Sequence, residues 1–159
     1  MEETGVSDVL IIIKELALSV KHSPDNWILD SGVTSHIYCD INLFNSLAPT
    51  STRIAWGNAT NLPAYSIGAV TVKLLNSARA ILESVLYVLE LKLNLVSLAR
   101  LTQKGAKISF LKGRADILLK SSVKLLATAD SQGLFYLPFS VDLYLTLPTT
   151  TLDKTELWH

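Results

Sequence analysis

The chain has 159 residues, of which 49% are hydrophobic and 18% charged, and its mean hydropathy is +0.35. This composition predicts one folded domain and excludes global disorder, which requires low hydrophobicity and high net charge. The 14 basic and 14 acidic residues cancel, which leaves no positive excess for a nucleic-acid backbone. We therefore expect no direct nucleic-acid binding by this chain.

The chain divides into three segments of different character. Residues 1–25 are predicted to be an N-terminal extension, whose apolar run is too short to span a membrane. Residues 26–139 are predicted to form the folded domain, and residues 140–159, rich in Thr, Leu and Pro, to begin as a linker. The single cysteine cannot form an internal disulfide. We therefore expect an intracellular, cytoplasmic location without membrane association.

Short apolar segments separated by turns predict a mostly β domain. The expected strands are 27–29, 53–56, 62–65, 67–75, 80–88, 106–111, 115–119, 123–127 and 134–137. Apolar residues alternate from Ala69 to Leu74, as in a half-buried strand, and Gly68 is expected to form a bulge or bend. This many short strands favours a β-barrel or a sandwich.

Two helical segments are expected among these strands. Asn94 is a suitable N-cap, the following leucines have helical spacing, and Lys104-Gly105 is a stop signal. These features predict one short α-helix at about 94–104. A single helical turn, capped by Asp40, is expected within residues 40–47.

Asp30-Ser31-Gly32 is the most informative motif for chemistry. It follows an apolar strand, and Gly32 allows the backbone to turn closely beneath the Asp30 carboxylate. An aspartic protease needs a carboxylate on such a loop. The tripeptide alone fits an ordinary turn equally well, so its meaning depends on the residues around it.

The residues around this tripeptide, and several later segments, supply that context. W-I-L-D-S-G-V-T-S-H at 27–36, D-x-x-x-F at 40–44, and the segments 56–63, 67–70 and 85–97 occur in order. Together they resemble the protease of copia-type retrotransposon Pol polyproteins, a retropepsin-like aspartic protease. The final Leu-Trp-His resembles the start of the pre-integrase segment. The resemblance implies a closed β-barrel with a flap hairpin and one short helix.

The resemblance also implies which residues act. Asp30 would be catalytic, and the active-site loop would be Ser31, Gly32 and Val33. The flap that contacts substrate would include Trp56, Gly57, Asn58 and Ala59. The implied function is an aspartic endopeptidase that hydrolyses polyprotein or peptide substrates without a cofactor or metal. Because the chain has no second Asp-Ser/Thr-Gly motif, its active form would be a homodimer with one Asp from each chain.

Departures from the family pattern keep a second interpretation open. Val33 replaces Ala, Asn58-Ala59 replaces Asp-Gly, and Leu89-Glu90 replaces Pro-Gly. These changes would suit a diverged, inactive β-barrel module that acts in dimerisation or peptide binding, so enzymatic activity is left open.

The neighbouring Cys39 and His36 raise the alternative of a nucleophilic pair. Cys39 is more simply explained as a small buried residue, and His36 as a structural one.

Overall fold

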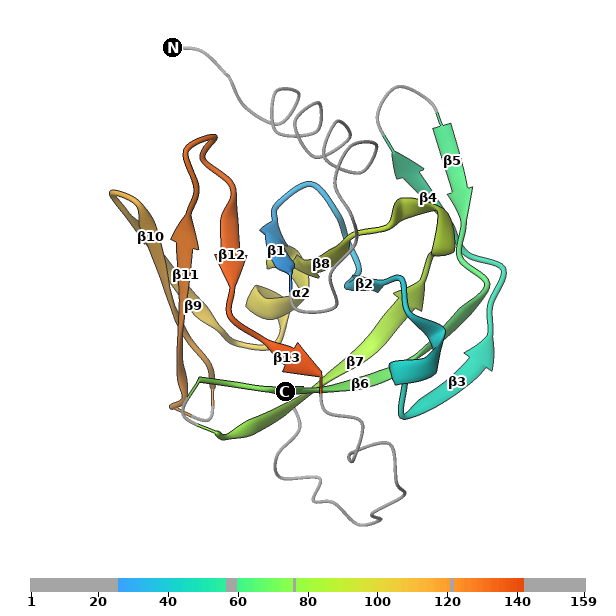
Figure 1. The fold of residues 1–159 in the computed structure, drawn as a ribbon, viewed down its shortest axis with the longest axis horizontal. Helices are drawn as coiled ribbons and strands as arrows, with labels where there is room; N and C mark the ends of the chain where they lie inside the picture. Colours follow the sequence, from blue (N-terminus) through green and yellow to red (C-terminus); the bar gives the residue numbers. More distant parts are fainter. Residues whose placement is uncertain (1–25, 57–59, 76, 121, 142–159) are drawn as a thin grey trace.

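The computed structural model describes residues 26–56, 60–75, 77–120 and 122–141. The predicted N-terminal extension and most of the predicted linker lie outside these residues. The described part is mostly β with one short α-helix, as the sequence predicts (Figure 1). The strands are β1 (Trp27–Asp30), β2 (Ile37–Tyr38), β3 (Ser46–Pro49), β4 (Arg53–Trp56), β5 (Thr60–Pro63), β6 (Ser66–Lys73), β7 (Arg79–Tyr87), β8 (Asn94–Ser97), β9 (Lys107–Leu111), β10 (Arg114–Leu118), β11 (Lys124–Ala129), β12 (Phe135–Leu137) and β13 (Ser140–Val141).

Two predictions near these strands need correction. The helix α2 covers Leu98–Gln103 rather than 94–104, and its N-cap is Ser97. Residues 94–97 instead form β8, because both faces of this segment are buried and it pairs along β1. Ser140 and Val141, which were expected to begin the linker, instead form β13 and pair with β6.

Most of the strands form one sheet. Its hydrogen-bonded order is β13-β6-β7-β2-β8-β1-β12-β11-β10-β9, with β3 paired to β6, and β4–β5 form a separate hairpin. In the described residues this path is open, because β13 and β9 end it without pairing to each other. The closed barrel expected from the sequence is therefore not what the structure forms.

The chain changes strand partner between Leu137 and Ser140. Leu137 pairs with Trp27 of β1, whereas Ser140, only three residues later, pairs with Lys73 of β6. Pro138 lies between them, and the Phe139 N–H donates to the Leu137 carbonyl at 2.9 Å. This tight turn directs β13 to the β6 edge, while β9 stays at the other end of the path.

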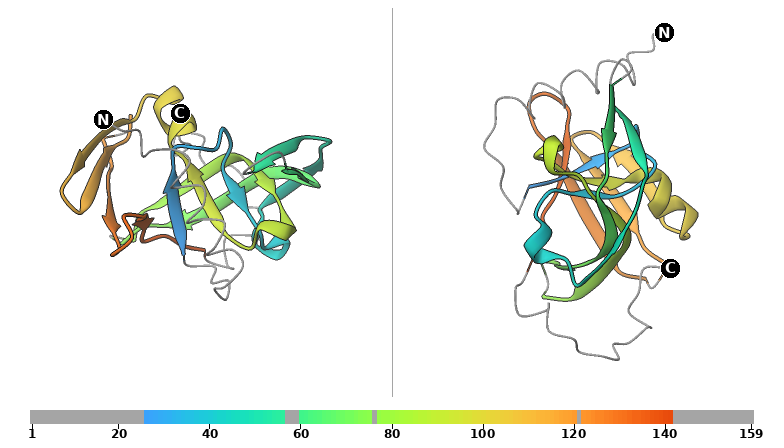
Figure 2. Two further views of the ribbon diagram at one scale, coloured as in Figure 1. Left: turned by 90° about the horizontal axis from the view of Figure 1, so that it is seen from above. Right: turned by 90° about the vertical axis from the view of Figure 1, so that its right-hand side faces the viewer.

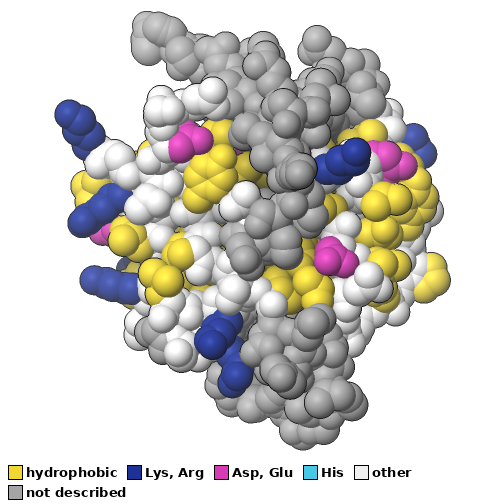
Figure 3. Space-filling view, viewed as in Figure 1, with side chains coloured by type: hydrophobic (Ala, Val, Ile, Leu, Met, Phe, Trp, Pro, Cys, Tyr) yellow, Lys and Arg dark blue, Asp and Glu magenta, His cyan; other side chains and the backbone are white. Residues whose placement is uncertain are grey.

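The strands β9–β11 and the β4–β5 hairpin lie at opposite ends of the molecule (Figures 1 and 2). Between them lie β1, β8 and α2. Figure 3 shows Lys and Arg side chains along the β9–β11 side; these strands carry Lys107, Arg114 and Lys124. Acidic side chains are scattered over the same view.

The core is divided between the two faces of β1. Trp27 and Leu29 pack in one hydrophobic cluster, which also contains Tyr38, whereas Ile28 packs in a second cluster with Val33. This division follows from the alternation of side chains along a strand. All four residues of β1 are buried, so the strand that carries Asp30 is fixed on both faces.

Candidate active site

Asp30 is the last residue of β1, and two strands hold it in place. β8 runs parallel to β1, with Asp30 opposite Ser97, and β12 runs antiparallel on the other side. Alternation along β1 puts Asp30 on the same side as Ile28. The Asp30 side chain is 1% exposed, whereas Ser31 and Gly32, which follow it, are exposed.

The two oxygens of the Asp30 carboxyl have different surroundings. Oδ1 accepts a hydrogen bond from the Gly32 N–H at 2.8 Å, which forms the tight turn expected from the motif. Oδ2 is buried and accepts no hydrogen bond from the described residues. Burial raises the pKa of Asp30, and the Gly32 hydrogen bond opposes this only in part. The carboxyl therefore holds its proton more strongly than an exposed aspartate.

The third loop residue, Val33, faces the interior of its own chain. Its side chain is 4% exposed and belongs to the same hydrophobic cluster as Ile28 and Ile37. Its carbonyl accepts a hydrogen bond from the Ser97 hydroxyl at 2.7 Å. The additional methyl groups relative to Ala are thus accommodated in the core.

Ser97 was not singled out by the sequence analysis, although it contacts the loop directly. It is fully buried, and its N–H donates to His36 Nδ1 at 3.0 Å. The signal in the sequence was a serine placed immediately before a helix, a favoured N-cap position. Asn94 supplied a competing cap three residues earlier, and only the pairing of β8 with β1 decides between them.

The predicted flap corresponds to a hairpin, β4–β5, in which Arg53 pairs with Pro63 and Trp56 with Thr60. Ile54 and Leu62 pack against the cluster that contains Val33. The hairpin and the Asp30 loop therefore contact one shared core. Trp56 lies at the end of β4, whereas Gly57, Asn58 and Ala59 lie outside the described residues.

The geometry argues against Cys39 and His36 as a nucleophilic pair. Burial, with the nearby Asp40 carboxylate, raises the pKa of Cys39 to about 12, so the thiol stays protonated at neutral pH. Burial, with Arg100 and Lys104, lowers the pKa of His36 to about 3. His36 Nδ1 already accepts the Ser97 N–H, so it cannot take a proton from Cys39.

Within residues 26–56, 60–75, 77–120 and 122–141, no group of three or more His, Cys, Asp or Glu side chains could hold a metal ion. In the same ranges, no helix has the length and apolar character needed to cross a membrane.

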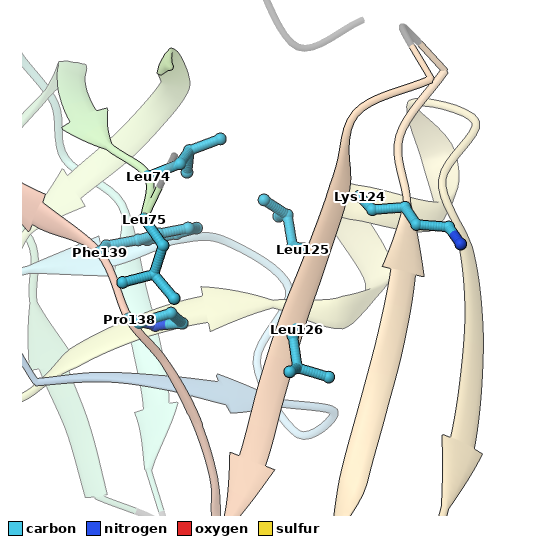
Figure 4. A pocket seen from close by; sticks show the side chains of 7 residues that line it. All are labelled: Leu74, Leu75, Lys124, Leu125, Leu126, Pro138 and Phe139. Carbon is cyan, nitrogen blue, oxygen red and sulfur yellow. The ribbon is translucent and has the colours of Figure 1, made fainter. Parts of the chain in front are cut away.

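A small apolar pocket lies elsewhere in the fold (Figure 4). Its volume is about 150 Å³, and its lining residues are Leu74, Leu75, Lys124, Leu125, Leu126, Pro138 and Phe139. The Lys124 amine points away from the apolar side chains in this view. None of these residues belongs to the Asp30 loop or to β4–β5, so the pocket is separate from the candidate site.

The fold and this site define a mostly β domain that carries a buried aspartate on a tight loop. Comparison with protein families shows that the chain belongs to the family of the Pol polyprotein β-barrel domain, whose model matches residues 27–106. The chain is also similar to the retrovirus-related Pol polyprotein from transposon RE1 of Arabidopsis thaliana. The two are 27% identical over 150 residues, which cover 91% of this chain and 10% of that protein. No solved structure matches the chain.

Proposed function

We propose that this chain is the aspartic endopeptidase segment of a copia-type retrotransposon polyprotein. The observation that carries the proposal is the Asp30 carboxyl at the end of β1, which has one oxygen fixed by the Gly32 N–H and the other without a hydrogen-bond partner in the described residues. Membership of the Pol polyprotein β-barrel family supports the same assignment.

The proposed active form is a homodimer, because one chain supplies only one such aspartate. In peptide hydrolysis of this type, two carboxyl groups share one proton. The ionised carboxylate removes a proton from water, and the protonated carboxyl donates a hydrogen bond to the carbonyl of the scissile bond. The raised pKa of Asp30, which is caused by burial, favours the protonated role for one of the two carboxyl groups. In this proposal β4–β5 closes over a peptide substrate.

The test is cleavage of a peptide library between pH 4 and 7 by the wild type and by Asp30→Asn. The loss should be about a thousandfold or more, because Asn can neither remove nor donate the required proton. Asp130→Asn is the matched control. Asp130 also closes a turn, accepting hydrogen bonds from the Gln132 and Leu134 N–H groups, but it is exposed. We expect this control to cleave like the wild type.

Full cleavage by Asp30→Asn would refute the assignment. Sedimentation of the same samples tests the dimer: a monomer that cleaves in an Asp30-dependent manner would refute the requirement for two chains.

A second candidate is an inactive β-barrel module that acts in dimerisation or peptide binding. The observation that favours it is the 1% exposure of Asp30, since a reacting carboxyl has to meet water and substrate. The expected result for this candidate is no cleavage by the wild type at any pH, together with peptide binding that Asp30→Asn leaves unchanged.

Val33→Ala refines that comparison, since Ala is the residue expected in the active family pattern. Val33 is buried in the core, so its truncation should cost about 1 to 2 kcal/mol of stability. If the second candidate is correct, this variant should lose stability without gaining cleavage.

A further inference from the structure

Ser97 lies where three elements meet. In β8, Ser97 is paired opposite Asp30 of β1. Its hydroxyl donates a hydrogen bond to the Val33 carbonyl at 2.7 Å. The same oxygen accepts a hydrogen bond from the Arg100 N–H at 3.2 Å and so caps α2. Ser97 is fully buried. One side chain therefore links the strand beside the aspartate, the loop after it and the start of the helix.

His36 fixes this junction from the other end of the loop. Its Nδ1 accepts the Ser97 N–H at 3.0 Å, and its own carbonyl accepts the Leu86 N–H from β7 at 2.9 Å. The ring is 5% exposed. Because Nδ1 is the acceptor, the ring proton is on Nε2 in the neutral tautomer.

We propose that Ser97 and His36 are positioning residues for Asp30. The Ser97 hydroxyl bonds to the Val33 carbonyl, and His36 Nδ1 bonds to the Ser97 N–H. These two contacts keep the loop of residues 31–35 in the turn in which the Gly32 N–H donates to the Asp30 carboxyl. Neither side chain is proposed to touch substrate. The inference rests on the proposed function for its catalytic consequence, but the loop geometry can be measured without any activity.

A buried polar group that loses its hydrogen-bond partner destabilises the fold. Without the Ser97 hydroxyl, the Val33 carbonyl loses that hydrogen bond, and without His36 Nδ1 the Ser97 N–H loses its acceptor. Both losses are relieved if the loop moves so that these groups reach water. Such a movement would disturb the turn that orients Asp30, and small displacements of a reacting group are costly to catalysis.

Hydrogen exchange at the Gly32 amide reports directly on this turn. We would measure its rate relative to the Leu119 amide, which bonds to the Val123 carbonyl between β10 and β11 and so reports on a hairpin that does not contain the loop. In Ser97→Ala the ratio should rise about tenfold or more. Ala99→Gly is the control, because it weakens α2 by about as much as loss of the cap would but leaves the hydrogen bonds of the loop intact.

A second pair of variants tests the acceptor and remains informative if Ser97→Ala does not fold. His36→Phe keeps a ring but removes Nδ1, whereas His36→Asn places Oδ1 the same number of bonds from Cα as Nδ1. The exchange ratio should rise in His36→Phe and stay within about threefold of wild type in His36→Asn. If only the size of the side chain mattered, the exchange ratio would rise more in His36→Asn than in His36→Phe, and the inference would be wrong.

The catalytic consequence is tested by measuring kcat and KM for peptide cleavage by the same variants. Ser97→Ala and His36→Phe should lower kcat about tenfold to a hundredfold, with KM within about twofold. An unchanged exchange ratio in both variants overturns the inference, whatever happens to cleavage. A raised ratio in a protein whose wild type shows no Asp30-dependent cleavage supports the loop positioning and overturns the proposed function.

Discussion

The Cys39 thiol donates a hydrogen bond to the side-chain oxygen of Asn94 at 3.5 Å, across 55 residues of sequence. Asn94 also donates from Nδ2 to the Asn26 carbonyl at 3.2 Å. Asn94 is fully buried and Cys39 is 8% exposed. The asparagine that looks like a helix cap in the sequence therefore joins the start of β1 to the segment after β2.

Cys39 should be unreactive in the folded protein. A thiol of pKa about 12 with little exposure supplies almost no thiolate at pH 8. We expect an alkylating reagent to label native protein at least about a hundredfold more slowly than protein in denaturant. Labelling is measured by intact mass over time. Rapid labelling of the native state would reopen the nucleophilic alternative.

Asp30→Asn should change the pH dependence of stability. Because folding raises the pKa of Asp30 above 3.8, the native state binds the proton more tightly. The contribution of Asp30 to the free energy of unfolding of the wild type is therefore lost as pH rises above 3.8. Asn can still accept the Gly32 N–H, and a neutral amide costs less to bury than a carboxylate.

We expect the variant to be more stable than the wild type near pH 7 and equal to it near pH 3. Urea unfolding midpoints at fixed protein concentration measure the difference. A difference that does not vary with pH would contradict the raised pKa.

His36 should make the protein sensitive to acid. Its pKa falls from 6.5 to about 3 on folding, chiefly through burial, with Arg100 and Lys104 adding repulsion. Between these values the unfolded state binds more protons, so stability rises with pH and is fully present above 6.5. The loss near pH 3 should be about 5 kcal/mol at most.

His36→Asn lacks the titrating ring and serves as the reference for this effect. The difference in unfolding free energy between wild type and variant should shrink or reverse as pH falls from 6.5 to 3. Parallel pH profiles would show that His36 is not buried in its neutral form.

Gly68→Ala should be strongly destabilising. A Cβ at Gly68 would overlap the Ser46 carbonyl of β3, and β3 cannot withdraw without losing its pairing with β6. We expect a loss of about 2 to 3 kcal/mol. Gly113→Ala is the comparison: it has open space but a φ of +77°, so it should cost only about 1 kcal/mol. Equal losses would contradict this packing explanation.

Local patterns predicted most of the strands, but not β2, β3, β8 and β13. The alternation from Ala69 to Leu74 corresponds to β6, and the expected irregularity at Gly68 is confirmed by a register shift between Gly68 and Val70. Asp40 caps the 3₁₀ turn Ile41–Leu43 by accepting the Asn42 N–H. The alternation and the Asp40 cap depend on neighbouring residues alone, which is why the sequence reveals them.

The features that could not be predicted from the sequence depend on pairing with residues far away along the chain. Ser46 and Leu47, the first two residues of β3, were expected within a segment that forms a helical turn, but they pair with β6. Asn94 was assigned to a helix because nothing local shows that residues 94–97 lie along β1. Asp30 was found from its motif, whereas Ser97 became relevant only once the two strands were paired.

The order in which β1 acquires its neighbours has a consequence for synthesis. Trp27 and Leu29 pair with β8 on one side and with β12, ending at Leu137, on the other. Pairings so far apart in sequence form late in folding. On the ribosome, the strand bearing Asp30 therefore waits for more than a hundred further residues before its second neighbour emerges. A nascent chain is thus kept from completing this site until nearly the whole domain has been translated.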